Sequence, residues 1–291
     1  MERVDPSALR WLIGVELTHY RKLSGRPQSE VAKVLGISAG MVAHFEVGRY
    51  FPSPDQIARM LGFYGAPAHD VERLSWLAGR ADDHSWLARW SDVIPDWLKT
   101  FIGLEGLASH VVTYAPLVLN ALVQTREYST GVTESSARVR ADQVERLVGL
   151  RMERQELVHR AENPVHLTML LEESVLDRPI GGDNAREVMR DQLAHLLELG
   201  KRDNIEILLL PTAIGRHDGL EGKFTLLHFR DPDGQPQAQS IVYVEIPDNS
   251  VYIQDQRQVA QYTRNADQLR DAALSESKSA TAIKKRLAAY D

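Results

Sequence analysis

The sequence predicts an α+β protein of more than one domain, with an all-α region first and a mixed β-sheet later in the chain. Two observations predict this. The chain has 291 residues, 43% of them hydrophobic, which is long enough for more than one buried core. Near residue 165 the spacing of apolar residues changes from the helical period of about 3.6 to the strand period of about 2. We expect an all-α domain over 1–80, a helical connector over 81–134 and an α+β domain over 135–291.

The all-α region contains five short amphipathic segments separated by glycine and proline. The second segment, 28–35, is preceded by Pro27 and ended by Gly36, and a glycine at a helix end accepts the left-handed backbone that most residues avoid. The third begins after Ser38, a residue suited to cap a helix. The five expected helices are 7–24, 28–35, 38–48, one carrying Ile57 to Tyr64, and 71–79.

The connector is expected to be helical and packed, not a flexible linker. Four tryptophans, Trp76, Trp86, Trp90 and Trp97, lie in or next to its first part, and core or interface packing is the preferred interpretation of such a group. Pro116 is expected to open a helix over 117–125. A longer amphipathic helix is expected over 136–162, ended by Asn163-Pro164.

The last segment alternates in a way that predicts a mixed sheet. Two apolar strands, 165–173 and 205–211, flank an amphipathic helix capped by Asp183, which is the pattern of a parallel β-α-β crossover. Three further strands are expected to return antiparallel because turn-forming residues separate them. These strands are 223–229, 240–246 and 250–254, and two helices, 255–273 and 275–290, follow them.

Composition limits the classes of function. The chain has no cysteine, which excludes disulfides, thiolate catalysis and cysteine-bound metal. No segment has the apolar length of a membrane span, so we expect a cytoplasmic protein without membrane contact, cofactor or metal. The net charge is −6, yet residues 1–66 hold eight Lys or Arg and six Asp or Glu, a net of +2 against −8 for the remainder. A polyanionic partner should therefore meet the N-terminal region.

Residues 28–49, QSEVAKVLGISAGMVAHFEVGR, have the spacing of a helix-turn-helix. Ala32 is small enough for two helices to cross closely, and Gly36 suits the tight turn. If Ile37, Val42 and Phe45 face the core, the opposite face of the second helix is left small and uncharged. On or beside that face lie Ser38, Ala39, Gly40, Met41, Ala43 and His44, and such a helix can enter the major groove of double-stranded DNA closely.

The expected DNA contacts divide into one base reader and several backbone contacts. His44 is the strongest hydrogen-bonding side chain on the exposed face and the first choice for a base reader; the alternative is an exposed histidine without a contact. Gln28 and Ser38 stand at helix starts, where backbone amides suit a phosphate. The remaining contacts are cations flanking the motif: Lys22, Arg26, Lys33, Arg49 and, less directly, Arg59.

Arg21 and Glu46 are assigned to structure, not to DNA. An arginine of the first helix paired with a glutamate of the recognition helix would fix the angle of that helix. One such module makes few phosphate contacts, so we expect a homodimer that spans two half-sites about 34 Å apart.

The residues of the motif also resemble a known class. Residues 9–65 are similar to the Xre class, the Cro and phage-repressor (lambda-repressor-like) type of helix-turn-helix regulator. The pattern is carried by Arg21, Gly25, Gln28, Ala32, Gly36, Ser38, Glu46, Gly48 and Pro52.

The remainder resembles the large C-terminal domain of unknown function that follows such a head in many actinobacterial regulators. Its marks are PDWLKTFIGLEGLAS, VLNALVQTREY, EESVLDRPIGG, MRDQLAHLLELGKRDNIEILLLP, GKFTLLHF and VYVE. This resemblance implies a transcription factor of development, stress or secondary metabolism, often encoded beside a small protein in an antitoxin-like pairing.

Two other functions of the C-terminal domain stay open. Catalysis is not expected, because no nucleophile elbow, metalloprotease helix, Walker loop or dinucleotide fingerprint is present, and the adjacent Glu172 and Glu173 should point to opposite faces of a strand. The other polar candidates are Asp177, Arg178, His217, Asp218 and His228, with 217–218 expected in a solvated loop. Binding is the stronger alternative: loop 211–222, with Arg178, Arg216 and His217, is a candidate site for an effector or a small protein partner.

Overall fold

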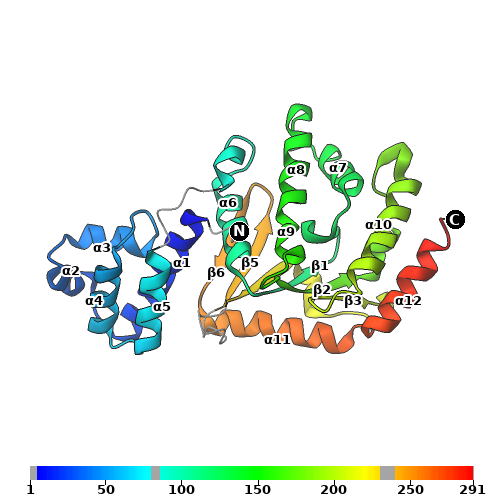
Figure 1. Ribbon diagram of the computed structural model, residues 1–291. Coiled ribbons are helices and arrows are strands. Elements are labelled where there is room, and N and C mark those ends of the chain that lie inside the picture. Colours follow the sequence, from blue (N-terminus) through cyan, green and yellow to red (C-terminus); the bar gives the residue numbers. More distant parts are fainter. Residues whose placement is uncertain (1–4, 80–85, 230–239, 291) are drawn as a thin grey trace. The chain divides into compact units, whose positions relative to one another are not determined.

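The computed structural model describes residues 5–79, 86–229 and 240–290, and these form two compact units. The first unit lies within residues 1–107 and the second within residues 108–291. Figure 1 shows the first unit as helices only, whereas the second contains the sheet.

Five helices of the first unit surround one apolar core. They are α1 (Pro6–Leu23), α2 (Gln28–Leu35), α3 (Ala39–Glu46), α4 (Pro54–Tyr64) and α5 (Ala68–Ala78). Their starts follow from local chemistry. Asp5 accepts hydrogen bonds from the first amides of α1, and Ser53 and Gln56 form a reciprocal capping box at α4.

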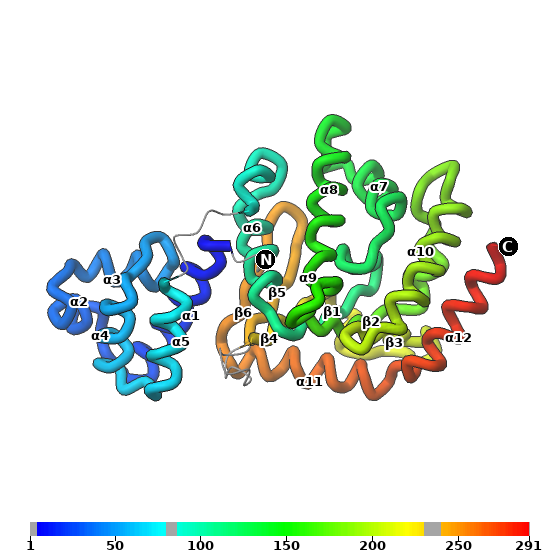
Figure 2. The backbone as a smooth tube through the Cα atoms, viewed as in Figure 1, coloured from blue at the N-terminus to red at the C-terminus, as the bar shows by residue number. Residues whose placement is uncertain are grey.

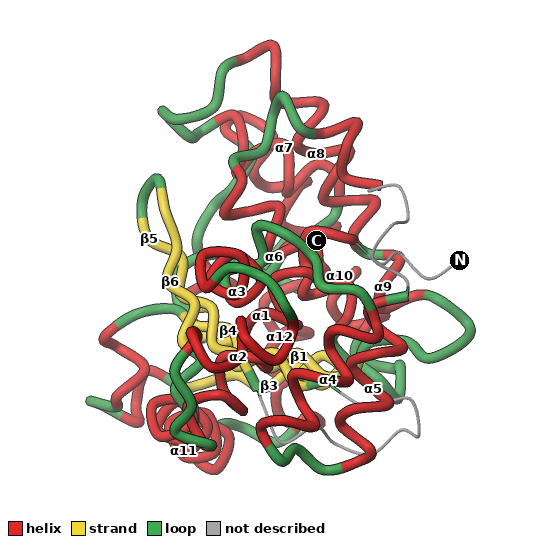
Figure 3. Tube along the Cα trace, turned by 90° about the vertical axis from the view of Figure 1, so that its left-hand side faces the viewer, coloured by secondary structure: helices red, strands yellow, loops and turns green. Residues whose placement is uncertain are grey.

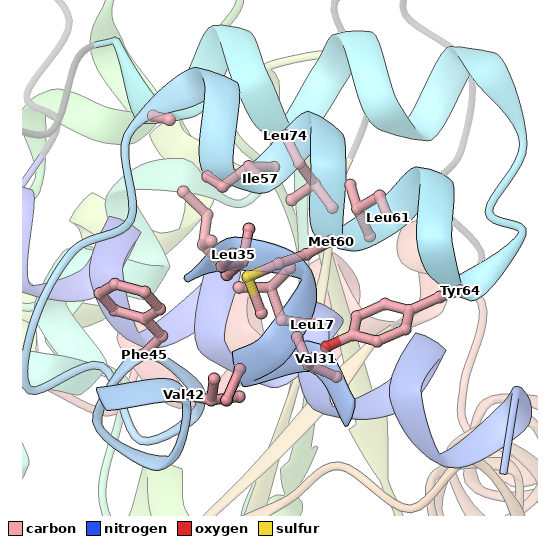
Figure 4. Packing of buried hydrophobic residues seen from close by; sticks show 13 residues of the cluster. Leu17, Val31, Leu35, Val42, Phe45, Ile57, Met60, Leu61, Tyr64 and Leu74 are labelled. Atoms are coloured by element: carbon pink, nitrogen blue, oxygen red, sulfur yellow. The ribbon is translucent and has the colours of Figure 1, made fainter. Parts of the chain in front are cut away.

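The core of these helices lies between α1, α2, α3, α4 and α5, and Figure 4 shows it. Leu17 from α1, Val31 from α2, Val42 from α3, and Ile57 and Met60 from α4 are all fully buried. The first unit continues through a 3-10 turn, η1 (Trp86–Trp90), to α6 (Asp96–Leu107), and α6 packs against the start of α1. A side chain at Gly103 would clash with Ala8 and Asp5, so this glycine permits the close approach.

The second unit is built on a six-stranded mixed sheet in the order β3-β2-β1-β4-β5-β6. Strands β1, β2 and β3 are parallel, while β4, β5 and β6 return antiparallel from β1. The strands are coloured yellow in Figure 3. Their bounds are β1 (His110–Ala115), β2 (His166–Glu172), β3 (Ile205–Leu210), β4 (Phe224–His228), β5 (Ile241–Ile246) and β6 (Asn249–Ile253).

Helices cover both faces of this sheet. In Figure 2, α11 (Gln256–Ala272) runs along one face, and α8 (Val144–Arg154) and α10 (Ala185–Leu199) lie over the other. Val259, Ala266 and Leu269 of α11 are buried in one cluster with Tyr114, Leu170, Leu208, Phe224, Leu226 and Val242 of the strands. The remaining helices of this unit are α7 (Arg126–Glu134), α9 (Glu156–His159) and α12 (Glu276–Leu287).

The predicted mixed sheet with its parallel crossover and antiparallel returns is confirmed. The strand β1 was not anticipated, because this region was expected to be helical. His110–Ala115 is short and flanked by helical segments, so its period-2 signal is weak in the sequence. It nevertheless occupies a central position in the sheet, where β2 and β4 supply hydrogen bonds on both sides and tertiary context decides the conformation.

Three helix predictions near this strand were wrong in detail. Residues 117–125 contain only a 3-10 turn, η2 (Ala121–Val123), which Asn120 caps. The helix expected over 136–162 is divided into a 3-10 turn, α8 and α9. Asp183 does not cap α10: it lies in a 3-10 turn, and the capping position is occupied by Asn184 without a side-chain bond.

Candidate nucleic-acid interface

Helices α2 and α3 form a tight helix-turn-helix. Gly36 ends α2 in the left-handed conformation, with φ of 70°. The side chain of Ser38 then caps α3 by accepting a hydrogen bond from the amide of Met41 over 3.1 Å. Ala32 and Val42 are buried between the two helices. The turn therefore has the residue types that its geometry requires.

Glu46 fixes α3 to its neighbours through three hydrogen bonds. Arg21 of α1 donates to both of its carboxylate oxygens, Nε to Oε1 at 2.5 Å and Nη2 to Oε2 at 2.9 Å. Gln28 at the start of α2 donates to Oε2 at 2.8 Å. The hydrogen bond to Glu46 is the main cause that raises the pKa of Arg21 above its ordinary value. The carboxylate thus links three helices and sets the direction of α3.

Arg21 and Glu46 bind one another, which is the contact that their structural assignment requires. Their side chains are 17% and 6% exposed and satisfy one another. Gln28, which the sequence analysis placed at a phosphate, has its side-chain amide on Glu46. Its backbone amide still stands at the first turn of α2, where a phosphate contact is chemically suited.

The end of α3 is held against α1 by two glycines. A Cβ atom at Gly14 would lie 2.7 Å from the carbonyl oxygens of both Phe45 and Glu46. A Cβ atom at Gly48 would lie 2.9 Å from the Cα atom of Trp11, and Gly48 has φ of 70°. Only glycine fits these contacts, so the backbone of α3 and of the following turn is fixed in place.

The outward side of α3 is small and uncharged. Ser38, Ala39 and Gly40 are exposed, and Ala43 and His44 are half-buried. The ring of His44 stands edge-on to the ring of Tyr50, with centroids 5.2 Å apart and planes at 87°. The structure therefore brings the five predicted contact residues of this helix onto one surface.

The flanking cations differ in whether other groups of the protein already bind their side chains. Arg26 bonds to Glu30 at 3.1 Å and lies 4.8 Å from the centre of the Phe63 ring. Arg59 donates to the carbonyl of Val34 and is therefore partly engaged. The others are exposed and, within the described residues, have no ion-pair partner: Lys22, Lys33 and Arg49.

Sequence reasoning missed two exposed side chains that follow α3, Val47 and Tyr50. Val47 is 67% exposed and Tyr50 is 51% exposed, although large apolar side chains are usually covered in a soluble protein. The available signal was their position, because both follow the recognition helix directly in a turn fixed by Gly48.

The loop between β3 and β4 places His217 inward. The Nε2 atom of His217 lies 3.1 Å from Oε1 of Glu172, and the Tyr114 hydroxyl donates to the same oxygen at 2.8 Å. His217 and Glu172 are each 13% exposed, so the expectation of a solvated loop is wrong for His217. Gly219 packs over both rings, since a Cβ atom there would lie about 3.0 Å from each.

The two arginines of this candidate site behave differently from His217. Arg216 is 75% exposed and lies 3.6 Å from Asp218 and 3.7 Å from Glu221, so acidic neighbours already surround its charge. Arg178 is exposed at the end of a 3-10 turn after β2. Among the described residues, no contact joins the three side chains expected to act together.

The acidic residues after β2 serve to anchor a helix. Arg286 of α12 donates to Glu173 at 2.7 Å and to Asp177 at 2.8 Å. Glu172 and Glu173 therefore have different partners, but not through strand alternation as expected, because β2 ends at Glu172 and Glu173 begins a 3-10 turn. His228 bonds to Ser240 at 2.7 Å on another strand end. The described residues contain no group of three His, Asp or Glu that could hold a metal ion.

Comparison with protein families matches both units. Residues 12–74 match a family described as a helix-turn-helix domain. Residues 98–285 match a family described as a domain of unknown function, DUF5753. No curated protein and no solved structure matches the chain. In the part of the chain that the structure describes, no helix has the length and apolarity needed to cross a membrane.

The helix-turn-helix match agrees with the geometry of α2 and α3 and indicates DNA binding by the first unit. The second match covers well over half of the chain, including every strand of the mixed sheet. The chain is therefore a member of the DUF5753 family, with a helix-turn-helix domain ahead of the family domain.

Proposed function

We propose that this protein is a cytoplasmic, sequence-specific transcriptional regulator of the Xre class that binds DNA as a homodimer. The single observation that carries the proposal is the position of α3. Glu46 binds Arg21 and Gln28 and thereby fixes a helix whose outward side is uncharged. Exposed cations lie on the flanking segments at Lys22, Lys33 and Arg49.

This arrangement answers how an uncharged helix can bind a polyanion. Small side chains at Ala39, Gly40 and Ala43 allow the backbone of α3 to approach base edges closely. Charge neutralisation takes place outside the helix, where cations can reach the two phosphate backbones. Affinity and base discrimination therefore come from different residues of the first unit.

The homodimer follows from the small number of contacts. A single module with about three free cations would release few counterions and bind weakly at physiological salt. Two modules related by a two-fold axis would double these contacts and fix the distance between half-sites at about 34 Å.

The test is selection of duplexes from random DNA by the full chain. We expect enrichment of an inverted repeat, with two protein chains per duplex measured by light scattering. An Ala variant of His44 should accept more bases at one position of each half-site. Failure to enrich any duplex at low ionic strength would refute DNA binding, and one chain per duplex at full affinity would refute the dimer.

A second candidate function concerns the DUF5753 domain. We infer that it acts by binding a small protein partner or an effector, as in an antitoxin-like pairing, and not as an enzyme. Two leucines support a binding surface: Leu220 in the β3–β4 loop and Leu117 after β1 are each 60% exposed.

Co-expression with the product of a small open reading frame beside the gene tests this second function. We expect that protein to co-purify with the full chain and to be lost when Leu220 is replaced by Asp. A control variant, Leu23→Asp, alters another exposed leucine, 70% exposed, in the other unit. Loss of the partner from both variants, or from neither, would contradict a surface at this loop.

A further inference from the structure

We propose that His44 and Tyr50 form one reading unit, in which Tyr50 orients His44 to donate a hydrogen bond to N7 of a purine in the major groove. This inference rests on the proposed DNA binding and adds to it a residue and a chemical target. It is carried by the contact between the two rings, 5.2 Å apart at 87°, and by the fixed backbone that creates this contact.

The backbone between the two residues is determined by Gly48. Its left-handed conformation, with φ of 70°, turns the chain back at the end of α3. The amides of Arg49 and Tyr50 then bond to the carbonyl oxygen of His44, at 2.9 Å and 3.4 Å. This is the way in which a glycine ends a helix while satisfying its last carbonyls.

Contacts on both sides of Tyr50 prevent the turn from moving. Gly48 lies against the backbone of Arg10 and Trp11 in α1, with no room for a side chain. Phe51 packs against the buried cluster of the first unit. Tyr50 is thus held between two anchored residues, and its ring remains 51% exposed beside His44.

The edge-on contact limits the rotation of the imidazole. A histidine on an exposed helix face normally samples several rotamers, and ordering it on binding costs conformational entropy. Packing the His44 ring edge-on to Tyr50 removes part of this freedom before DNA arrives. Among the described residues, neither side chain has a hydrogen-bonding partner, so the polar atoms of both remain available.

Among the major-groove acceptors open to a single donor, which are N7, guanine O6 and thymine O4, N7 is the one that both purines share. A neutral imidazole carries one N–H donor and one acceptor nitrogen. In the major groove, guanine and adenine both present N7 as an acceptor, whereas neither pyrimidine has this atom. A donor directed from His44 to N7 would therefore accept guanine and adenine alike at one base pair, and dependence on N7 separates this contact from one to guanine O6 or thymine O4.

The experiment uses the full chain and the duplex selected from random DNA. Each purine of that duplex is replaced in turn by its 7-deaza analogue, which lacks the N7 acceptor and keeps the Watson–Crick edge. We expect one position per half-site at which the replacement lowers affinity about tenfold. In the variants His44→Ala and Tyr50→Ala, the 7-deaza replacement at this position should no longer lower affinity. The double variant should bind both duplexes as either single variant does.

The variant Tyr50→Phe tests whether Tyr50 acts through its ring, by positioning His44, or through its hydroxyl group. It keeps the ring and removes the hydroxyl group, so we expect sensitivity to the 7-deaza base to be retained. Equal melting temperatures of the four variants would show that the first unit stays folded, as expected for a half-exposed side chain.

Several results would overturn the inference. They are a duplex without any sensitive purine, sensitivity that persists in Tyr50→Ala, and a Tyr50→Phe variant that behaves like Tyr50→Ala. In each of these cases a duplex is still bound, so the proposed function stands. If no duplex is enriched at all, the proposed function itself has failed.

Discussion

The helix-turn-helix and the second unit position their polar side chains over different distances along the chain. In the first unit, Glu46 is held by Gln28 and Arg21, which are 18 and 25 residues away. In the second, Glu172 meets Tyr114 across 58 residues, and Arg286 meets Asp177 across 109. Local spacing is therefore informative in the helix-turn-helix, whereas the sheet brings together residues whose proximity depends on the whole topology.

The units also differ in how they bury charge. The first unit contains a nearly inaccessible ion pair between Glu16 of α1 and Arg73 of α5, 2% and 4% exposed, with Nη2 and Oε2 at 3.1 Å. Arg73 also bonds to Asp70 at 2.7 Å. Burial raises the pKa of Glu16, and Arg73 opposes this shift. In the second unit, by contrast, burial lowers the pKa of the half-buried His110 and favours its neutral form.

The largest expected effect comes from breaking the ion pair in the first unit. Arg73→Met should lower the free energy of unfolding of this unit by about 3–5 kcal/mol, because Glu16 is left buried without its partner. All five tryptophans lie within residues 1–107, so tryptophan fluorescence during urea denaturation reports on this unit. The double variant Glu16→Leu/Arg73→Met should recover part of the loss. A single variant as stable as the parent would contradict the prediction.

The next effect concerns the fixation of α3. Glu46→Ala leaves Arg21 and Gln28 without their shared acceptor and should lower the free energy of unfolding by about 2–3 kcal/mol. DNA affinity should fall with it, because the angle of α3 is no longer fixed. Glu46→Gln retains the shape and an acceptor oxygen and should show a smaller loss in both measurements. A Glu46→Ala variant that binds and melts normally would refute the structural assignment.

The third prediction uses acid to distinguish the units. Burial, with smaller contributions from His228, His166 and Arg270, lowers the pKa of His110 from 6.5 to about 4. The unfolded chain then binds this proton more readily than the folded one, so stability is lost as pH falls from 6.5 towards 4. The slope is at most about 1.4 kcal/mol per pH unit for one proton.

This acid effect should be measured by far-UV circular dichroism during denaturation at several pH values. His110→Gln should flatten the dependence in this window. The tryptophan signal, which reports on the first unit, should change less with the His110 substitution. An identical pH dependence in the parent and in His110→Gln would show that another group is responsible.

The smallest expected effect is that of a single flanking cation. Arg49→Ala should weaken binding to all duplexes alike and reduce the slope of log affinity against log salt by about one. Binding isotherms at several salt concentrations measure this slope. Arg216→Ala, which removes a similarly exposed arginine of the second unit, serves as the control and should leave the slope unchanged. A base-specific loss in Arg49→Ala would assign this residue to readout instead.

These contrasts show what the sequence could predict. The turn at Gly36, the small crossing residue Ala32 and the partners Arg21 and Glu46 all follow from spacing within a few dozen residues. The five later strands were also predicted, because turn-forming residues separate clear apolar runs. The strand His110–Ala115 was not, since its conformation depends on β2 and β4, which come later in the chain.

The candidate sites show the same division. The exposed side of α3 could be derived from helical periodicity. The inward position of His217 could not, because its partners Glu172 and Tyr114 lie on other strands. The contact between His44 and Tyr50 lies between these cases. The residues are six positions apart, yet the contact requires a left-handed Gly48 docked on α1, and a periodic pattern carries no information about that contact.

The late position of α12 in the chain has a consequence for folding during synthesis. The Ser279 hydroxyl accepts from the Leu209 amide of β3 at 3.0 Å, across 70 residues, so this strand stays incomplete until that helix has left the ribosome. Among the described residues, the buried cluster around the helix-turn-helix comes from positions 13–78, and ribosomes add about 5–20 residues per second. For some seconds, the nascent protein would therefore carry a folded helix-turn-helix while the second unit is still unfolded.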